Sequence, residues 1–159
     1  MLGYSYKRNL HVCGNLTFQD IKDKMRYEKS QNTYVGDGMN ENITYGQRLP
    51  NIPYFFMNGH ADYNFLDFGK KGNSLSLNYD VQYIHDYYLS FTGLGAKATK
   101  KVIPEQFCHN VSVGYSMKDG RYSILLECTD ISNEKLYDNY RLQKPGRSFN
   151  VKFRYYITK

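Results

Sequence analysis

The sequence predicts an all-β protein, an antiparallel meander of about seven long strands, and three observations support this class. Apolar and polar residues alternate with a period of two along several segments, as they do in a strand with one apolar and one polar face. Aromatic residues make up 16% of the chain, with 17 Tyr and 9 Phe, and such residues favour strands over helices. The connections between the alternating runs are short and long in turn, which indicates hairpins.

The N-terminal part contains two predicted strands. A short strand runs from Leu2 to Lys7 and is followed by a tight turn near Arg8. The second strand begins at Leu10 and is predicted to extend to about Tyr27. Its apolar and polar sides are Leu10, Val12, Leu16 and Phe18 against His11, Cys13, Asn15 and Thr17. A long polar segment follows over residues 28–51.

The central part contains the two clearest strands. The third is predicted from about Tyr54 to Phe68, and a Gly- and Lys-rich turn over residues 69–73 reverses the chain. The fourth strand alternates over its whole length, with Leu75, Leu77, Tyr79, Val81, Tyr83 and Tyr87 opposite Ser74, Ser76, Asn78, Asp80, Gln82 and Asp86. A second long segment covers residues 90–105.

The C-terminal part contains three further strands. The fifth places Val111, Val113, Tyr115 and Met117 opposite Asn110, Ser112, Gly114 and Ser116. The Asp119-Gly120 dipeptide is a strong hairpin signal, and a sixth strand follows from Tyr122 to about Cys128. A third long segment, residues 130–147, leads to the last strand, whose apolar side carries Phe149, Val151, Phe153, Tyr155 and Ile157.

The alternation of connection lengths places all tight turns at one end of the strands and all long segments at the other. Outer-membrane barrels have this asymmetry, with short periplasmic turns and long extracellular loops. The predicted strands are also long enough to cross a hydrocarbon core, which needs about 9 to 11 tilted residues. These patterns fit a partial outer-membrane β-barrel, located in the bacterial outer membrane and in contact with its lipid, and on their own they fit a soluble β-sheet as well.

Three segments carry a family resemblance: residues 51–56 (NIPYFF), 130–140 (DISNEKLYDNY) and 143–149 (QKPGRSF). Together they resemble the C-terminal end of a TonB-dependent outer-membrane receptor of Bacteroides-like bacteria. The resemblance implies a barrel of about 22 strands with a plug, which takes up an extracellular small ligand such as an iron chelate, haem, cobalamin or glycan. It also implies that Phe149, Val151, Phe153, Tyr155 and Ile157 form the closing strand that the barrel-assembly machinery recognises.

Two features depart from that family. The last residue is Lys159, where the family usually ends in an aromatic residue. About seven strands are also too few to close such a barrel, and no segment resembles a plug. Residues 1–159 are therefore expected to be the C-terminal segment of a receptor barrel without its plug domain, arising from truncation, a split gene or an artificial boundary. The energy-coupling TonB system would act only through the missing plug.

Other function classes have little support in the sequence. The net charge of +6 is scattered, with one cluster at Lys97, Lys100 and Lys101, so no nucleic-acid partner is expected. Three cysteines without a CxxC spacing favour neither a disulfide framework nor a zinc site. The pairs His11/Cys13, His60/Asp62 and His85/Asp86, and the loop residues Asp37, Asn40, Glu41 and Asn42, identify no nucleophile, cofactor site or metal site. We therefore expect no enzyme, no cofactor and no metal.

The alternative is a soluble β-sandwich that binds carbohydrate through exposed Tyr. In a sandwich, the face that carries Leu75, Leu77, Tyr79 and Val81 would pack on a second layer, whereas in a membrane wall it would be bare. The ligand cannot be read from the sequence, although Tyr34, Tyr45 and the Lys97–Lys101 cluster are candidate loop contacts.

Overall fold

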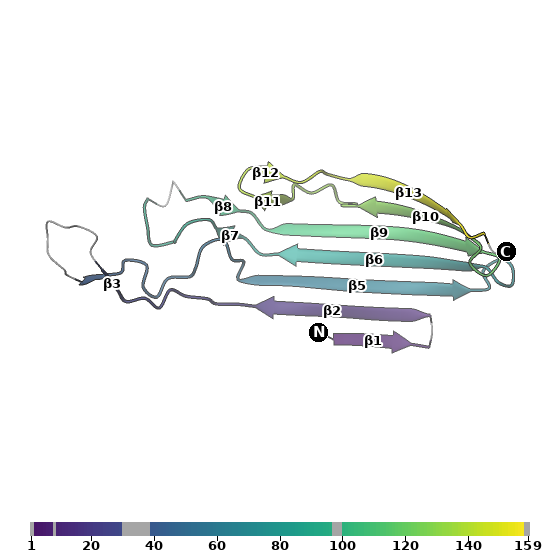
Figure 1. Ribbon diagram of the computed structural model, residues 1–159, viewed down its shortest axis with the longest axis horizontal. Helices are drawn as coiled ribbons and strands as arrows, with labels where there is room; N and C mark the ends of the chain where they lie inside the picture. Colours follow the sequence, from purple (N-terminus) through teal and green to yellow (C-terminus); the bar gives the residue numbers. More distant parts are fainter. Residues whose placement is uncertain (1, 8, 30–38, 97–99, 158–159) are drawn as a thin grey trace.

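The computed structural model describes residues 2–7, 9–29, 39–96 and 100–157. Its main feature is one seven-stranded sheet in the order β1-β2-β5-β6-β9-β10-β13, in which every neighbouring pair is antiparallel. The strands are β1 (Leu2–Tyr6), β2 (Leu10–Phe18), β5 (Phe55–Leu66), β6 (Ser74–Ile84), β9 (Gln106–Met117), β10 (Tyr122–Thr129) and β13 (Ser148–Tyr155). The predicted all-β class and antiparallel meander are confirmed, and Figure 1 shows the strands side by side in chain order.

Three two-stranded ribbons lie in the long connections, and the period-two pattern did not predict them. They are β3 (Tyr27–Lys29) with β4 (Met39–Glu41), β7 (Tyr87–Tyr88) with β8 (Val102–Ile103), and β11 (Tyr137–Asn139) with β12 (Leu142–Gln143). Strands of two or three residues are too short for an alternation to be recognised in the sequence. No described segment forms a helix long and apolar enough to cross a bilayer.

Two predicted strand ends are wrong. The second strand ends at Phe18 rather than near Tyr27, because Asp20 and Asp23 bind side chains and backbone of the same long connection instead of continuing the ladder. The fourth strand ends at Ile84, so Tyr87 belongs to β7, where it pairs with Ile103. In the described residues, the sheet is also not closed into a barrel, since β1 and β13 are its two unpaired edges.

The tight turns follow β1, β5 and β9 and form what we call the turn end of the sheet. The last of them requires backbone that favours glycine: φ is 52° at Lys118, 55° at Asp119 and 90° at Gly120. Positive φ at two successive turn residues matches the right-handed twist of a hairpin. The long connections, residues 19–54, 85–105 and 130–147, lie at the opposite end, the loop end.

The register combines the alternating strands into two chemically distinct faces. One row across the sheet is Tyr4, Val12, Ala61, Tyr79, Val111, Cys128 and Phe149, and it belongs to what we call the apolar face. The neighbouring row, on the polar face, is Ser5, His11, Asp62, Asn78, Ser112, Glu127 and Asn150. The predicted separation of apolar from polar side chains is therefore confirmed for most positions, with exceptions such as Leu125 on the polar face and His109 on the apolar face.

The sheet has no hydrophobic core of its own. Among the described residues, the buried hydrophobic side chains are Ile103 and Leu136, and both lie in the long connections. The described residues form no second sheet or helix over Leu75, Leu77, Tyr79 and Val81, and Leu77 and Tyr79 are each 39% exposed. Figure 1 shows this single layer, which lacks the second sheet that a sandwich requires.

Candidate functional site

The apolar face has no covering layer among the described residues: its large side chains are mostly exposed on β2, β10 and β13 and in part half-buried on β5, β6 and β9. Leu16 on β2 is 65% exposed, Leu126 on β10 is 49% exposed and Phe153 on β13 is 68% exposed. A soluble monomer rarely exposes a contiguous apolar patch larger than a few hundred square ångströms. A surface that extends across seven strands is therefore suited to contact with lipid or with another apolar layer.

On β2 and β10 the polar face is the more sheltered of the two. On β6, by contrast, Asp80 and Gln82 of the polar face are exposed, and β13 is exposed on both faces. On β2 the polar-face residues His11, Cys13, Asn15 and Thr17 are half-buried, whereas Val12, Leu16 and Phe18 on the apolar face are exposed. On β10 the polar-face residue Leu125 is half-buried, whereas its apolar-face neighbours Ile124 and Leu126 are exposed. Soluble sheets show the opposite arrangement, with the apolar face covered and the polar face solvated.

Aromatic residues concentrate toward both ends of the apolar face. At the loop end, rings in contact cross four strands, with centroid distances of 4.6 Å for the stacked pair Phe18–Phe55, 5.7 Å for the tilted pair Phe55–Tyr83 and 5.9 Å for the edge-on pair Tyr83–Phe107. We call this row the loop-end aromatic band. Ring pairs at such distances are worth about 0.5–1.5 kcal/mol each beyond their burial.

A second set, the turn-end aromatic band, lies near the tight turns. Its ring pairs are Tyr63–Phe65 at 4.5 Å, Phe68–Tyr115 at 6.4 Å and Tyr122–Tyr155 at 4.9 Å. The middle of the face between the bands is mostly aliphatic and includes Val12, Leu16, Met57, Ala61, Leu77, Val81, Val111, Val113, Ile124, Leu126 and Val151. Two aromatic bands that flank an aliphatic zone are typical of barrels at the two membrane interfaces.

The strand lengths fit this arrangement. Strands β5 and β9 each contain 12 residues. At about 3.3 Å per residue such a strand is roughly 36 Å long, and a tilt of about 40° reduces its height to roughly 28 Å. The hydrocarbon core of a bilayer is about 30 Å thick, so the longest strands can span it.

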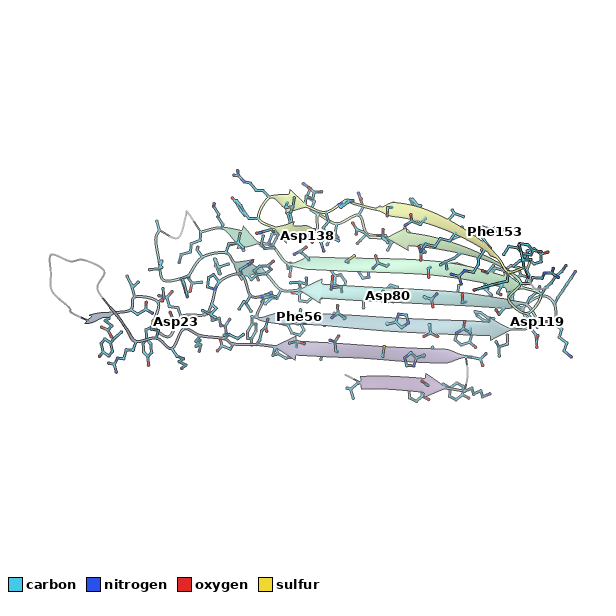
Figure 2. All side chains as sticks on the ribbon, in the orientation of Figure 1. Asp23, Phe56, Asp80, Asp119, Asp138 and Phe153 are labelled. Carbon is cyan, nitrogen blue, oxygen red and sulfur yellow. The ribbon has the colours of Figure 1, made fainter. Side chains whose placement is uncertain are left out.

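The polar face carries a hydrogen-bonded network at its centre. The Nδ1 atom of His60 lies 2.7 Å from Oδ1 of Asp80, and its Nε2 atom lies 3.4 Å from Oδ1 of Asp62. One step toward the loop end, the amide of Gln82 donates to Oδ1 of Asn58 over 3.0 Å. Figure 2 shows Asp80 near the middle of β6, well away from both ends of the sheet.

This network borders a shallow hollow of about 470 Å³. Its polar lining comes from the polar face of four adjacent strands: Cys13, Asn15, Asn58, His60, Asp80, Gln82 and Asn110. Amide and imidazole groups of this kind can hydrogen-bond a small polar solute or a polar protein segment. Near the C-terminal edge of the same face, Lys152 forms an ion pair with Glu127 at 2.7 Å.

An aspartate organises the first long connection. The carboxylate of Asp23 accepts hydrogen bonds from the Thr44 hydroxyl at 2.5 Å, the Asn42 amide at 3.0 Å and the Met25 backbone N–H at 2.8 Å. These bonds, the one from Thr44 above all, hold the pKa of Asp23 below its usual value. Asn42 is therefore part of a closed internal network, and Asp37 lies outside the described residues.

The long connections contact one another at the loop end. The Gly93 N–H donates to Oε1 of Gln47 over 2.8 Å, and the ammonium of Lys101 lies 5.0 Å from the ring centre of Tyr140. The third connection is also bound to the polar face, since Tyr137 N–H donates to Oε1 of Gln106 over 2.6 Å and Asp130 N–H donates to Asn110 over 3.0 Å. The three connections thus form one continuous layer.

A second hollow, of about 300 Å³, lies between the first two connections. We call it the loop pocket, and its polar and aromatic lining is Arg48, Tyr54, His85, Asp86, Tyr87, Tyr88, Ser90 and Thr92. The Arg48 guanidinium lies 4.4 Å from the centre of the Tyr54 ring and pairs with Asp20 at 2.5 Å. Burial raises the pKa of the Tyr87 hydroxyl.

The sequence did not identify the loop pocket. Its members lie in irregular backbone with no fixed spacing, and Tyr87 was assigned to a continuous strand. Of the loop contacts that the sequence did suggest, Tyr45 lies beside Arg26 at 5.9 Å, away from the pocket lining. Tyr34 and Lys97 lie outside the described residues.

The predicted closing-strand residues are brought together at the C-terminal edge. Phe149, Val151, Phe153 and Tyr155 lie on the apolar face of β13, and Ile157 lies two residues beyond the end of the strand. All five are exposed, from 43% at Tyr155 to 81% at Ile157. In Figure 2 the labelled Phe153 lies on this outermost strand.

The other sequence candidates have ordinary partners. Nδ1 of His11 lies 2.8 Å from the Ser5 hydroxyl. Nδ1 of His85 lies 2.9 Å from Oδ1 of Asp86, an ion-pair contact without the geometry of a hydrogen bond. Cys13, Cys108 and Cys128 are free thiols. In the part of the chain that the structure describes, no group of three or more His, Cys, Asp or Glu side chains could hold a metal ion.

Comparison with models of protein families, with curated proteins and with solved structures finds no match for this chain.

Proposed function

We propose that this chain is a segment of the wall of an outer-membrane β-barrel of the TonB-dependent receptor class. In this role the apolar face contacts membrane lipid and the polar face lines the interior of the barrel. Strands β1 and β13 pair with further strands that complete the barrel. The function is uptake of a scarce nutrient, and the chain contributes structure and ligand contacts rather than catalysis.

The uncovered apolar face, opposite a polar face on the same single sheet, is the observation that supports this proposal most. One face of the sheet carries His60, Asp62, Asp80 and amide side chains, whereas the other is aliphatic in its middle and aromatic at its ends. In water, each Å² of apolar surface left exposed on this face costs roughly 25 cal/mol of free energy. In a bilayer the same surface is in contact with acyl chains, and the polar side chains face the water inside the barrel.

The loop end has the properties of an extracellular capture surface. The layer of connected loops carries the loop pocket, where an arginine, a histidine and several tyrosines surround a hollow of about 300 Å³. Pockets of this kind bind small ligands through a few polar groups on an aromatic lining. In a complete receptor the energy-coupling TonB system would act through a plug, and the barrel-assembly machinery would recognise Phe149 to Ile157.

The experiment that tests this proposal is refolding of the purified chain in parallel in plain buffer, in detergent and in phosphatidylcholine vesicles. We expect aggregation in buffer, and in detergent or vesicles a β-type circular dichroism spectrum with protection of the strands from protease. A monodisperse, folded β protein in plain buffer would contradict the proposal, because the exposed apolar face would then need a cover other than lipid.

A further inference from the structure

The turn end of the sheet carries an excess of positive charge. Its described cationic residues are Lys7, Lys70, Lys71, Lys118, Arg121 and Arg154, and its acidic residues are Asp67 and Asp119. The long connections instead mix both signs, as in the pairs of Asp20 with Lys22 and of Asp138 with Lys144. The cations of the turn end lie directly beyond the turn-end aromatic band.

A hollow of about 570 Å³ lies at this boundary. We call it the turn-end hollow, and it is lined by Gly69, Lys70, Asn73, Tyr115, Met117, Lys118 and Tyr122. Tyr115, Met117 and Tyr122 belong to the apolar face, where Met117 and Tyr122 are direct cross-strand partners. The two lysines come from the turns after β5 and β9. One cavity therefore has an apolar wall on the sheet and a cationic rim on the turns.

The rim is held in place by local contacts. The amide of Asn73 donates to the Tyr115 hydroxyl over 2.8 Å, and its carbonyl oxygen accepts from the Lys118 N–H over 3.2 Å. The Lys118 ammonium lies 5.4 Å from the centre of the Tyr122 ring. Neither Lys70 nor Lys118 forms an ion pair with any carboxylate in the described ranges. Both ammonium groups are thus available to an external anion.

We propose that the turn-end hollow binds the headgroup of an anionic phospholipid, with its phosphate between Lys70 and Lys118 and its glycerol and upper acyl chains against Tyr115, Met117 and Tyr122. Charge complementarity favours an anion, and the apolar wall that continues into the apolar face favours one that carries acyl chains. This inference rests on the proposed function, because it requires that the apolar face lies in a bilayer.

The test is native mass spectrometry of the full chain refolded in micelles that contain equal amounts of phosphatidylglycerol and phosphatidylcholine. The double variant Lys70→Gln/Lys118→Gln is compared with Lys24→Gln/Lys135→Gln, which removes the same charge from the long connections. A Lys near an anionic surface contributes roughly five-fold to binding, so the first variant should lose the phosphatidylglycerol preference by roughly twenty-fold. The control variant should retain it.

The outcomes separate this inference from the proposed function. Absence of adducts with either lipid, together with failure to refold in micelles, would contradict the membrane role itself. Refolding with equal retention of both lipids, or with the preference unchanged in Lys70→Gln/Lys118→Gln, would overturn the lipid site alone. Displacement of phosphatidylglycerol by millimolar inorganic phosphate would also overturn it, because the hollow would then bind a free anion rather than a lipid.

Discussion

Leu125 and Leu126 offer a matched test of which face contacts lipid. The two residues are adjacent on β10 and identical in type, but they lie on opposite faces: Leu125 pairs with Gly114 and Lys152, and Leu126 pairs with Val113 and Val151. In water, Leu126 is 49% exposed, so an arginine there would change the free energy of unfolding by less than about 0.5 kcal/mol. In a bilayer, by contrast, the same arginine would face lipid and should be strongly destabilising.

The expected cost of Leu126→Arg depends on how deep this position lies in the bilayer. Leu126 is four residues from Tyr122 of the turn-end aromatic band, which is roughly 13 Å along the strand and roughly 10 Å in height at a tilt of about 40°. An apolar band about 25 Å tall has its midplane near that depth, where an outward-facing arginine costs about 2–4 kcal/mol. We therefore expect Leu126→Arg to reduce the folding equilibrium constant by roughly thirty-fold to several hundred-fold.

The assay is urea unfolding of the chain refolded in phosphatidylcholine vesicles, followed by circular dichroism. Leu125→Arg faces the polar side and should cost less than about 1 kcal/mol, mainly from lost packing and from the nearby Lys152. An equal or smaller cost for Leu126→Arg than for Leu125→Arg would refute the assignment of the apolar face to lipid.

Three further outcomes are expected. Gly59→Ala should lower the free energy of unfolding by about 1–3 kcal/mol in the same assay, because the added Cβ would lie 2.9 Å from Cγ1 of Val81. Adding Val81→Ala to this variant should restore most of the loss. Full stability of Gly59→Ala alone would argue against this packing. Because the pKa of Asp23 is lowered, its hydrogen bonds stabilise the first long connection fully above the ordinary pKa of 3.8, and this stabilisation is lost as the pH falls through the lowered pKa. The NMR chemical shift of the Met25 amide, which donates to Asp23, should therefore titrate below pH 3.8. The same shift should not change with pH in Asp23→Asn. Lys152→Gln should cost less than about 1 kcal/mol in urea unfolding, because the lysine of this ion pair is 64% exposed, and a larger loss would indicate a more buried pair.

The sequence predicted the main sheet because its strands are long and strictly alternating. Residues 74–83 of β6 alternate in type, and the register then aligns Tyr79 with Ala61 and Val111 on one face. The same reasoning extended β2 too far, because Asp20 and Asp23 act through contacts with Arg48 and Thr44 that lie far along the chain. A period-two pattern reports only which face of a strand each residue lies on, so it does not predict such long-range polar contacts.

The candidate surfaces were predictable to different degrees. The apolar residues of the last strand, from Phe149 to Ile157, share one edge as expected. The loop pocket and the turn-end hollow were not predictable, because each combines residues from separate connections whose approach depends on the folded sheet. The lysines of the turn after β5, for example, read in the sequence only as turn residues.

The most direct test of the central claim is the environment of single labels along β6. In a chain whose native cysteines are replaced by serine, a fluorescent label is attached to a new cysteine at position 77, 78, 79, 80 or 81, and the protein is refolded in vesicles. Quenching by brominated acyl chains should be strong at 77, 79 and 81, and quenching by aqueous iodide should be strong at 78 and 80. Loss of this alternation, with iodide quenching all five positions equally, would show that the apolar face is not in contact with lipid.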